Sequence, residues 1–204
     1  MVNELINILG KILTNILTAL YEPFGFSILL SFFAMFLWLF SYDPNHAGKG
    51  FKIAIITWFK KFRESLIFRK LFLLVFVTST ILFRTLLNRN ICMNPLSNIM
   101  GGWGIWVTMN GVKQLTTESI ENVIMMVPFT GILLWTFEKR VGSHLKNILC
   151  VCIKVAFCFS LTIETLQILL WLGTFQLSDI FYNTLGGVIA GLIYYVLMKV
   201  RKRL

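Results

Sequence analysis

The sequence of 204 residues is 57% hydrophobic and only 14% charged, with a formal net charge of +10. Soluble domains average about 45–50% apolar and about 25% charged residues, so a soluble globule of this composition would expose large apolar patches. Disorder requires low hydrophobicity, and four cysteines in this length exclude a disulfide scaffold. The composition therefore predicts a single integral membrane protein.

The N-terminal segment, residues 1–22, has apolar residues at helical spacing, among them Leu9, Leu13 and Leu17, with polar residues between them. This pattern predicts an amphipathic helix that is too polar to cross a bilayer. We expect its apolar stripe to lie along the outer membrane surface; packing of the stripe on the helical bundle is the alternative. The remainder, residues 23–204, is predicted to be the membrane domain.

Five apolar runs that follow are long enough to cross a hydrocarbon core of about 30 Å. They cover approximately residues 24–40, 71–87, 120–137, 148–172 and 180–198. None has the basic start and small-residue cleavage site of a removable signal peptide. The predicted fold class is all-α: a polytopic transmembrane bundle of about five spans, with an N-terminal amphipathic interfacial helix. A second amphipathic piece, near residues 51–62, is expected on the cytoplasmic face, where anionic lipids attract its lysines.

The basic residues are concentrated in every second segment between the predicted spans. Of the 19 Lys and Arg residues, seven lie between the first two spans, three between the third and fourth, and four after the fifth. Because cytoplasmic loops are enriched in Lys and Arg, the N-terminus is predicted outside and the C-terminus in the cytoplasm, in a bacterial plasma membrane. Orientation and lipid contact thus account for the charge, and a nucleic-acid partner is not predicted.

Polar side chains in four of the spans are predicted to gather at one depth, in the outer half of the membrane. They are Arg84, Glu121, Asn122, Glu164, Gln167, Asp179 and Asn183. Glu164 and Gln167, for example, would lie about 12 and 7 Å below the outer end of their helix at 1.5 Å per residue. Such residues are costly in lipid, so they form either a functional site or contacts that hold the bundle together. We predict an outer-leaflet polar pocket in which Arg84 is the counter-charge of one of the carboxylates.

The segment between the second and third spans, about residues 88–119, is too apolar for a free linker. It contains Asn94 and two tryptophans, Trp103 and Trp106, which suit a membrane interface. We predict that it forms a lid or a re-entrant element over the pocket, and a plain interfacial loop is the alternative.

Small residues and a proline predict local features of two spans. Gly187 and Gly191 have the GxxxG spacing that lets two helix backbones approach closely. Pro128 lies in the middle of the third span, where it removes one helical hydrogen bond and favours a kink.

Signals for metal or nucleotide chemistry are weak. Cys150 and Cys152 are two residues apart and so point away from each other on a helix. His46 and His144 fall in predicted cytoplasmic loops, away from the pocket. No nucleotide-binding motif occurs. We therefore predict no metal site and no disulfide, and the sequence identifies no cofactor.

Three spaced motifs together resemble the VanZ-like family of bacterial membrane proteins. They are Asn122-x5-Pro128-Phe129, Glu164-x2-Gln167, and Asp179-x3-Asn183-x2-Gly186-Gly187, and the elements Asn94-Pro95-Leu96-Ser97 and Gly102-Trp103 also look like those of the family. The resemblance covers about residues 84–191. Family members often carry an arginine and a second acid before the aspartate that corresponds to Asp179, whereas Gly173 and Ser178 stand at those places here.

The family is named for a protein that confers resistance to teicoplanin, a lipoglycopeptide antibiotic. The resemblance implies a pocket that binds or shields a lipid head group or a lipid-linked cell-wall precursor, and so lowers access of the antibiotic. The candidate binding residues are Arg84, Asn94, Glu121, Asn122, Glu164, Gln167, Asp179 and Asn183. The alternative is an intramembrane enzyme acting on a lipid or lipid-linked substrate, with Glu164 as general base or Asp179 as a cation ligand. A transporter is a weaker hypothesis because no polar path continues to the cytoplasm.

Overall fold

The computed structural model describes residues 2–42, 50–109 and 112–201. Of the residues used above, His46, Lys49 and the last two basic residues of the tail lie outside this part of the chain. The spanning helices are α2 (Phe24–Tyr42), α4 (Leu66–Leu82) with its π-helical continuation η1 (Phe83–Leu87), α5 (Glu118–Thr136), α7 (Leu145–Leu170) and α8 (Leu177–Arg201). Five described segments are long and apolar enough to cross a membrane. The predicted all-α bundle of about five spans is confirmed.

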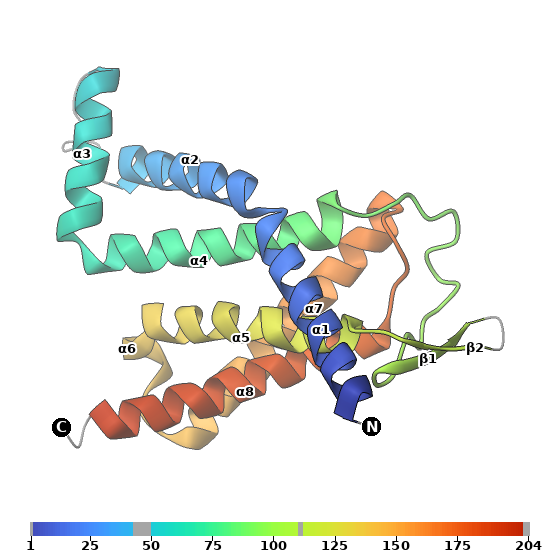
Figure 1. The fold of residues 1–204 in the computed structure, drawn as a ribbon. Coiled ribbons are helices and arrows are strands. Elements are labelled where there is room, and N and C mark those ends of the chain that lie inside the picture. Colours follow the sequence, from blue (N-terminus) through green and yellow to red (C-terminus); the bar gives the residue numbers. More distant parts are fainter. Residues whose placement is uncertain (1, 43–49, 110–111, 202–204) are drawn as a thin grey trace.

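Consecutive spanning helices run in opposite directions, as the alternation of the basic residues requires (Figure 1). We call the end of the bundle that carries η1 and the N-termini of α5 and α8 the loop end; it lies to the right in Figure 1. The opposite end carries α3 (Phe51–Glu64), the short helix α6 (Glu138–Val141) and the C-terminus of α8, and we call it the basic end. By the charge count, the loop end is the predicted outer end.

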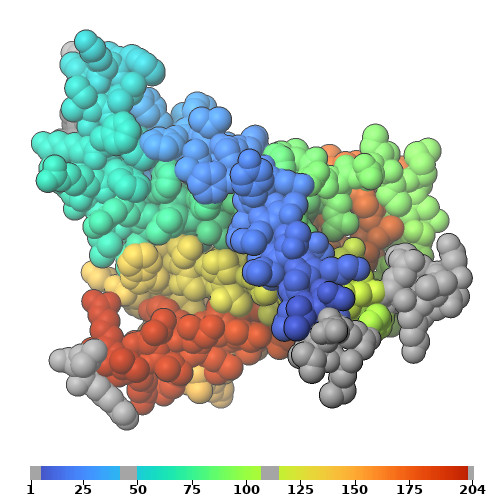
Figure 2. All heavy atoms as spheres, viewed as in Figure 1, coloured from blue at the N-terminus to red at the C-terminus, as the bar shows by residue number. Residues whose placement is uncertain are grey.

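Helix α1 (Val2–Tyr21) crosses the bundle at a steep angle to α2 and lies over its surface near the loop end (Figures 1 and 2). Leu9, Leu13 and Leu17 are each more than half exposed, so this face of α1 is directed away from the bundle. The C-terminal half of α1 packs on the bundle, where Ala19 is buried. The exposed leucines suit the expected interfacial helix, whose position relative to the membrane stays a prediction.

Helix α3 also lies across the bundle, at the basic end (Figure 1). Its Trp58 is buried and stacks on Phe32 of α2, with ring centroids 4.4 Å apart, and on Phe62 of its own helix. Trp58 also packs edge-on against Phe68 of α4. An amphipathic piece is therefore fixed to the first two spans by aromatic packing.

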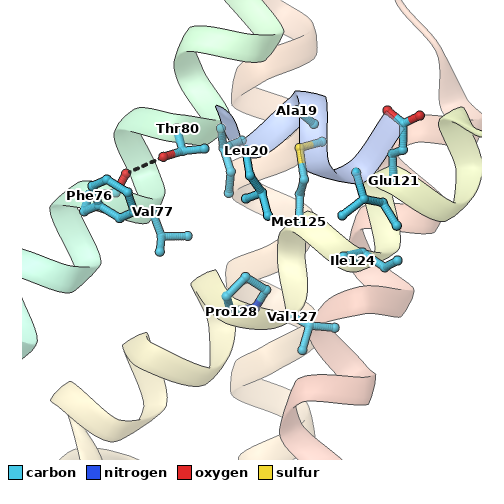
Figure 3. Close-up of a pocket in the computed structure, with 12 residues that line it drawn as sticks. Ala19, Leu20, Phe76, Val77, Thr80, Glu121, Ile124, Met125, Val127 and Pro128 are labelled. Carbon is cyan, nitrogen blue, oxygen red and sulfur yellow. Dashed lines mark hydrogen bonds between the residues drawn. The ribbon is translucent and has the colours of Figure 1, made fainter. Parts of the chain in front are cut away.

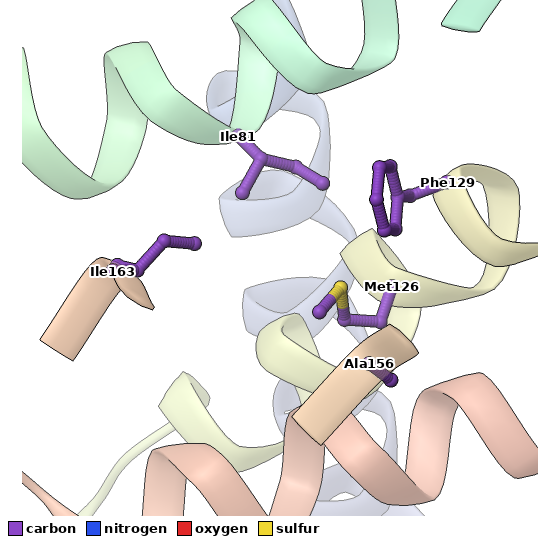
Figure 4. Packing of buried hydrophobic residues seen from close by; sticks show 5 residues of the cluster. All are labelled: Ile81, Met126, Phe129, Ala156 and Ile163. Carbon is purple, nitrogen blue, oxygen red and sulfur yellow. The ribbon is translucent and has the colours of Figure 1, made fainter. Parts of the chain in front are cut away.

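Helix α8 packs closely on α7, as the glycine spacing predicts. A Cβ atom at Gly187 would lie 2.6 Å from the Cβ of Ala156, and one at Gly191 would lie 2.7 Å from the Sγ of Cys152. Neither distance leaves room for a side chain, so the glycines permit this approach. Beside this contact, the apolar cluster in Figure 4 joins α4, α5 and α7; it consists of Ile81, Met126, Phe129, Ala156 and Ile163.

The segment between η1 and α5 contains a feature that the sequence did not predict, an antiparallel hairpin of strands β1 (Trp106–Met109) and β2 (Val112–Leu115). Before the hairpin, the chain runs along the α7–α8 connection. Three backbone hydrogen bonds join the two segments: Cys92 N to Trp171 O (2.7 Å), Phe175 N to Pro95 O (2.8 Å) and Leu177 N to Ile99 O (2.8 Å). The segment is therefore part of the folded loop end.

Candidate functional site

A polar cavity of about 260 Å³ lies at the loop end, between η1, α5 and α8. It is lined by Arg84, Thr85, Asn88, Arg89, Glu118, Glu121, Asn122, Met125 and Asp179. Ligand pockets are ordinarily lined mostly by apolar side chains with a few polar groups. Here two arginines and three carboxylates face one small volume in a protein that has few charged residues. We call this site the polar cavity.

Arg84 pairs with Glu121, one of the three carboxylates proposed as its counter-charge. The Nη2 atom of Arg84 donates to Oε2 of Glu121, which is buried. The other carboxylate oxygen accepts a hydrogen bond from the hydroxyl of Thr117 (2.5 Å), and that hydroxyl accepts one from the side-chain amide of Asn15 (2.5 Å). This chain of contacts ties α1, α5 and η1 together at the edge of the polar cavity, and it leaves the buried carboxylate well satisfied.

Asp179 lies in the first turn of α8, where the helix dipole favours a negative charge. Its carboxylate interacts with the side chains of Asn122 and Ser178. The Arg89 guanidinium exerts an attractive field on both Asp179 and Glu164. Asp179 and Asn122 are thus brought together at the polar cavity, with Arg89 as the neighbouring positive charge.

The Arg89 side chain also lies beside Gly173. A Cβ atom at Gly173 would be 3.7 Å from Nη1 of Arg89. The backbone of Gly173 has a φ of +90°, a conformation that L side chains rarely adopt. Arg89, from the segment between η1 and α5, therefore occupies the space next to Gly173 in the α7–α8 connection.

Three of the predicted site residues do not line the polar cavity, although all are buried. Oε2 of Glu164 accepts a hydrogen bond from the backbone N–H of Gln176 (2.7 Å). Gln167 donates to the carbonyl oxygen of Thr85 (2.8 Å), within the π-helical turn. Asn183 donates to the hydroxyl of Ser160 (2.8 Å). Their contacts are those expected of residues that hold helices together, which was the alternative interpretation.

Asn94 is exposed and also lies outside the set of cavity-lining residues. The segment around it packs over the start of α8 instead. Trp103 contacts the rings of Phe181 and Tyr182, and the N–H of Gly104 donates to the Tyr182 hydroxyl (2.8 Å). Of the described residues of the predicted lid, only Asn88, Arg89 and Glu118 line the polar cavity.

Sequence reasoning missed Arg89, Glu118 and Asn88 as cavity residues. Arg89 was counted only as a loop charge because it lies beyond the predicted second span, and in the structure it follows the end of η1 by two residues. Glu118 precedes Asn122 by four residues, so helical spacing would have placed both on one face had the third span been started two residues earlier.

A second, apolar cavity of about 460 Å³ adjoins the first (Figure 3). It lies between α1, α4 and α5, and Thr80 and Glu121 are its only polar lining residues in the described chain. Thr80 donates its hydroxyl hydrogen to the Phe76 carbonyl (2.9 Å), so it offers little polarity to the space. Glu121 and Met125 line both cavities. We call this space the apolar cavity.

The described residues contain no group of three or more His, Cys, Asp or Glu side chains arranged to hold a metal ion. Of the two carboxylates named for the enzymatic alternative, Asp179 faces the polar cavity, whereas Glu164 is engaged by a backbone amide.

The chain matches the model of the VanZ/LLP1 family over residues 4–198, and it belongs to that family. The match takes in α1 and the first span as well as the segment 84–191 that carries the motifs. The chain is a multi-pass membrane protein, as its five candidate spans and its family indicate. No curated protein and no solved structure matches it.

Proposed function

We propose that this VanZ-family protein binds the phosphate-bearing head group of a membrane lipid or of a lipid-linked cell-wall precursor in the polar cavity. The cavity itself supports the proposal, because it gathers five charged side chains around one small volume at the loop end. Ionisable groups near the membrane are costly and usually mark a ligand or ion site.

The charges in the polar cavity suit a head group with both an acceptor and a donor. Arg84 and Arg89 supply positive charge for a phosphate, and guanidinium groups bind phosphate with two parallel hydrogen bonds. Glu118 and Asp179 accept hydrogen bonds, and they favour an ammonium or hydroxyl group next to the phosphate. The lining has two positive and three negative side chains, so a purely anionic ligand would meet net repulsion.

Such binding at the outer face of the membrane would shield the head group from other molecules. By its family, the relevant molecule is a lipoglycopeptide such as teicoplanin, whose access to lipid-linked targets the protein would lower. This step depends on the predicted orientation, in which the loop end faces outward.

Lipid retained through purification tests the proposal. Arg89→Gln and Asp179→Asn each remove one charged contact, and a hydrogen bond to a charged group contributes about 1.5–3 kcal/mol, so retention of the bound phospholipid should fall roughly tenfold or more. The measurement is mass spectrometry of lipid bound to protein purified in mild detergent. Cells that express the same variants should lose protection against teicoplanin.

Two controls make the same chemical changes elsewhere. Arg69→Gln and Glu64→Gln replace exposed residues near the basic end and should leave both lipid retention and protection unchanged. Equal retention by all four variants, at wild-type levels of folded protein, would rule the proposal out. Conversion of the bound lipid into a new product would favour the enzymatic alternative.

A further inference from the structure

We infer that the two adjoining cavities form one bipartite site, in which the apolar cavity holds a hydrocarbon chain of the same lipid whose head group lies in the polar cavity. This inference rests on the proposed function and adds to it the class of ligand: an amphiphile with a phosphate next to a donor group, held by head and chain together. Neither cavity alone specifies that class.

The inference rests on the adjacency of the two cavities. Glu121 and Met125 belong to both linings, so these two side chains form the boundary across which one ligand would extend from the polar cavity into the apolar one. In Figure 3 the Glu121 carboxylate lies at one side of the lining residues, and the apolar side chains of Phe76 and Val77 lie at the opposite side. Polarity therefore falls from the charged end to the apolar end along one path, as it does along a lipid.

The apolar cavity is shaped in part by α1. Ile16, Ala19 and Leu20 of α1 form one wall, opposite side chains of α4 and α5. The volume of about 460 Å³ lies within the range of about 300–1,000 Å³ for small-molecule pockets. Its lining offers no group that would fix a polar ligand except Glu121, which is already paired with Arg84. A hydrocarbon chain is the occupant that fits this chemistry.

Any bilayer lipid can occupy an apolar groove, so the test must show that the chain depends on the head-group site. The probe is phosphatidylethanolamine that carries a photoreactive group in the middle of one acyl chain, incorporated with the full-length protein in lipid nanodiscs. In the wild type, cross-links should concentrate on Ile16–Leu20 and Ile124–Pro128. Asp179→Asn, which alters only the polar cavity, should lower these chain cross-links at least threefold.

A second pair of variants examines the apolar cavity directly. Ile124→Trp fills part of it, whereas Ile153→Trp places the same bulk on an exposed face of α7. Ile124→Trp should lower chain cross-linking in the apolar cavity at least threefold, yet retain cross-links from a second probe whose photoreactive group is on the head. Ile153→Trp should change neither.

The two proposals fail in different ways. If the head probe labels the polar cavity but chain cross-links do not respond to Asp179→Asn, the bipartite site is wrong and the head-group site stands. If the head probe labels the polar cavity no more than the rest of the surface, the proposed function fails first. Unlabelled phosphatidylethanolamine and an unlabelled polyprenyl-phosphate sugar serve as competitors, and the one that displaces the probe at lower concentration identifies the source of the head group.

Discussion

Glu121 is the residue on which most contacts of the site converge. It pairs with Arg84, accepts the Thr117 hydroxyl and lines both cavities. Since its side chain is buried and that of Arg84 is mostly so, each charge depends on the other for compensation. Removal of one partner from a buried pair costs more than removal of both.

Replacement of Glu121 by glutamine should therefore destabilise the protein by about 3 kcal/mol, because Arg84 is left unpaired. The measurement is thermal unfolding in detergent. The double variant Arg84→Gln, Glu121→Gln should recover part of this loss, since no unpaired charge remains. If the stability lost by the double variant equals the sum of the losses of the two single variants, Arg84 and Glu121 do not stabilise each other.

The partners of individual side chains were the part of the site that the sequence predicted least well. Arg84 was expected to have a carboxylate partner, but Glu121, Glu164 and Asp179 were equally available to it by depth. Which carboxylate pairs with Arg84 depends on how each helix is rotated about its own axis, and the spacing of polar residues does not fix that rotation. Arg89 was missed because it lies just beyond the end of the second span, where the chain leaves the helix after Leu87 and no motif in the sequence fixes its path.

Among the elements, α8 is central to the bundle because it packs against both α5 and α7. A Cβ atom at Gly186 would meet the backbone of α5 at Val123, and one at Gly187 would meet α7. By contrast, Gly131 of α5 has no atom within 4 Å of the place where a Cβ would lie. These two positions, Gly187 and Gly131, provide a matched pair of glycines in spanning helices.

The same substitution should have opposite effects at these two positions. Gly187→Ala should destabilise by about 1–3 kcal/mol, since the added methyl group overlaps Ala156. Gly131→Ala should be neutral or stabilise by up to about 1 kcal/mol, through the higher helix propensity of alanine. Thermal unfolding of both variants and the wild type in one detergent measures these changes in stability. Equal stability of the two would contradict the close packing of α7 and α8.

Elements were predicted better than their contacts. The five spanning helices begin and end within about five residues of the expected positions, because hydrophobic length is set by the bilayer. The amphipathic helices were also expected from their periodicity. The hairpin of β1 and β2 was not, since its few residues lie in a segment whose apolar tryptophans suggested only an interface. The packing of Trp103, which precedes the hairpin, on α8 depends on tertiary contacts that no local pattern predicts.

For the whole molecule, orientation in the membrane follows from the basic residues alone. Fourteen of 19 Lys and Arg residues belong to one predicted side, and this predicts α3 in the cytoplasm and the polar cavity outside. Residues at the two ends are accessible for labelling. Asn98 of the loop end and Lys60 of α3 are both exposed.

Cysteine labelling in intact cells should confirm this orientation. With the four native cysteines replaced by alanine, a membrane-impermeant maleimide should modify an Asn98→Cys variant at once and a Lys60→Cys variant only after permeabilisation. The reverse result would place the polar cavity in the cytoplasm, where it could not shield a target from a lipoglycopeptide.

Whether the polar cavity holds a lipid head group is decided by a cryo-EM structure of the protein in nanodiscs of native lipid. We expect density for a phosphate within hydrogen-bonding distance of Arg89, with a chain that continues past Glu121 between α1 and α5. A polar cavity closed by its own side chains, or holding only water while lipid density lies elsewhere, would contradict it.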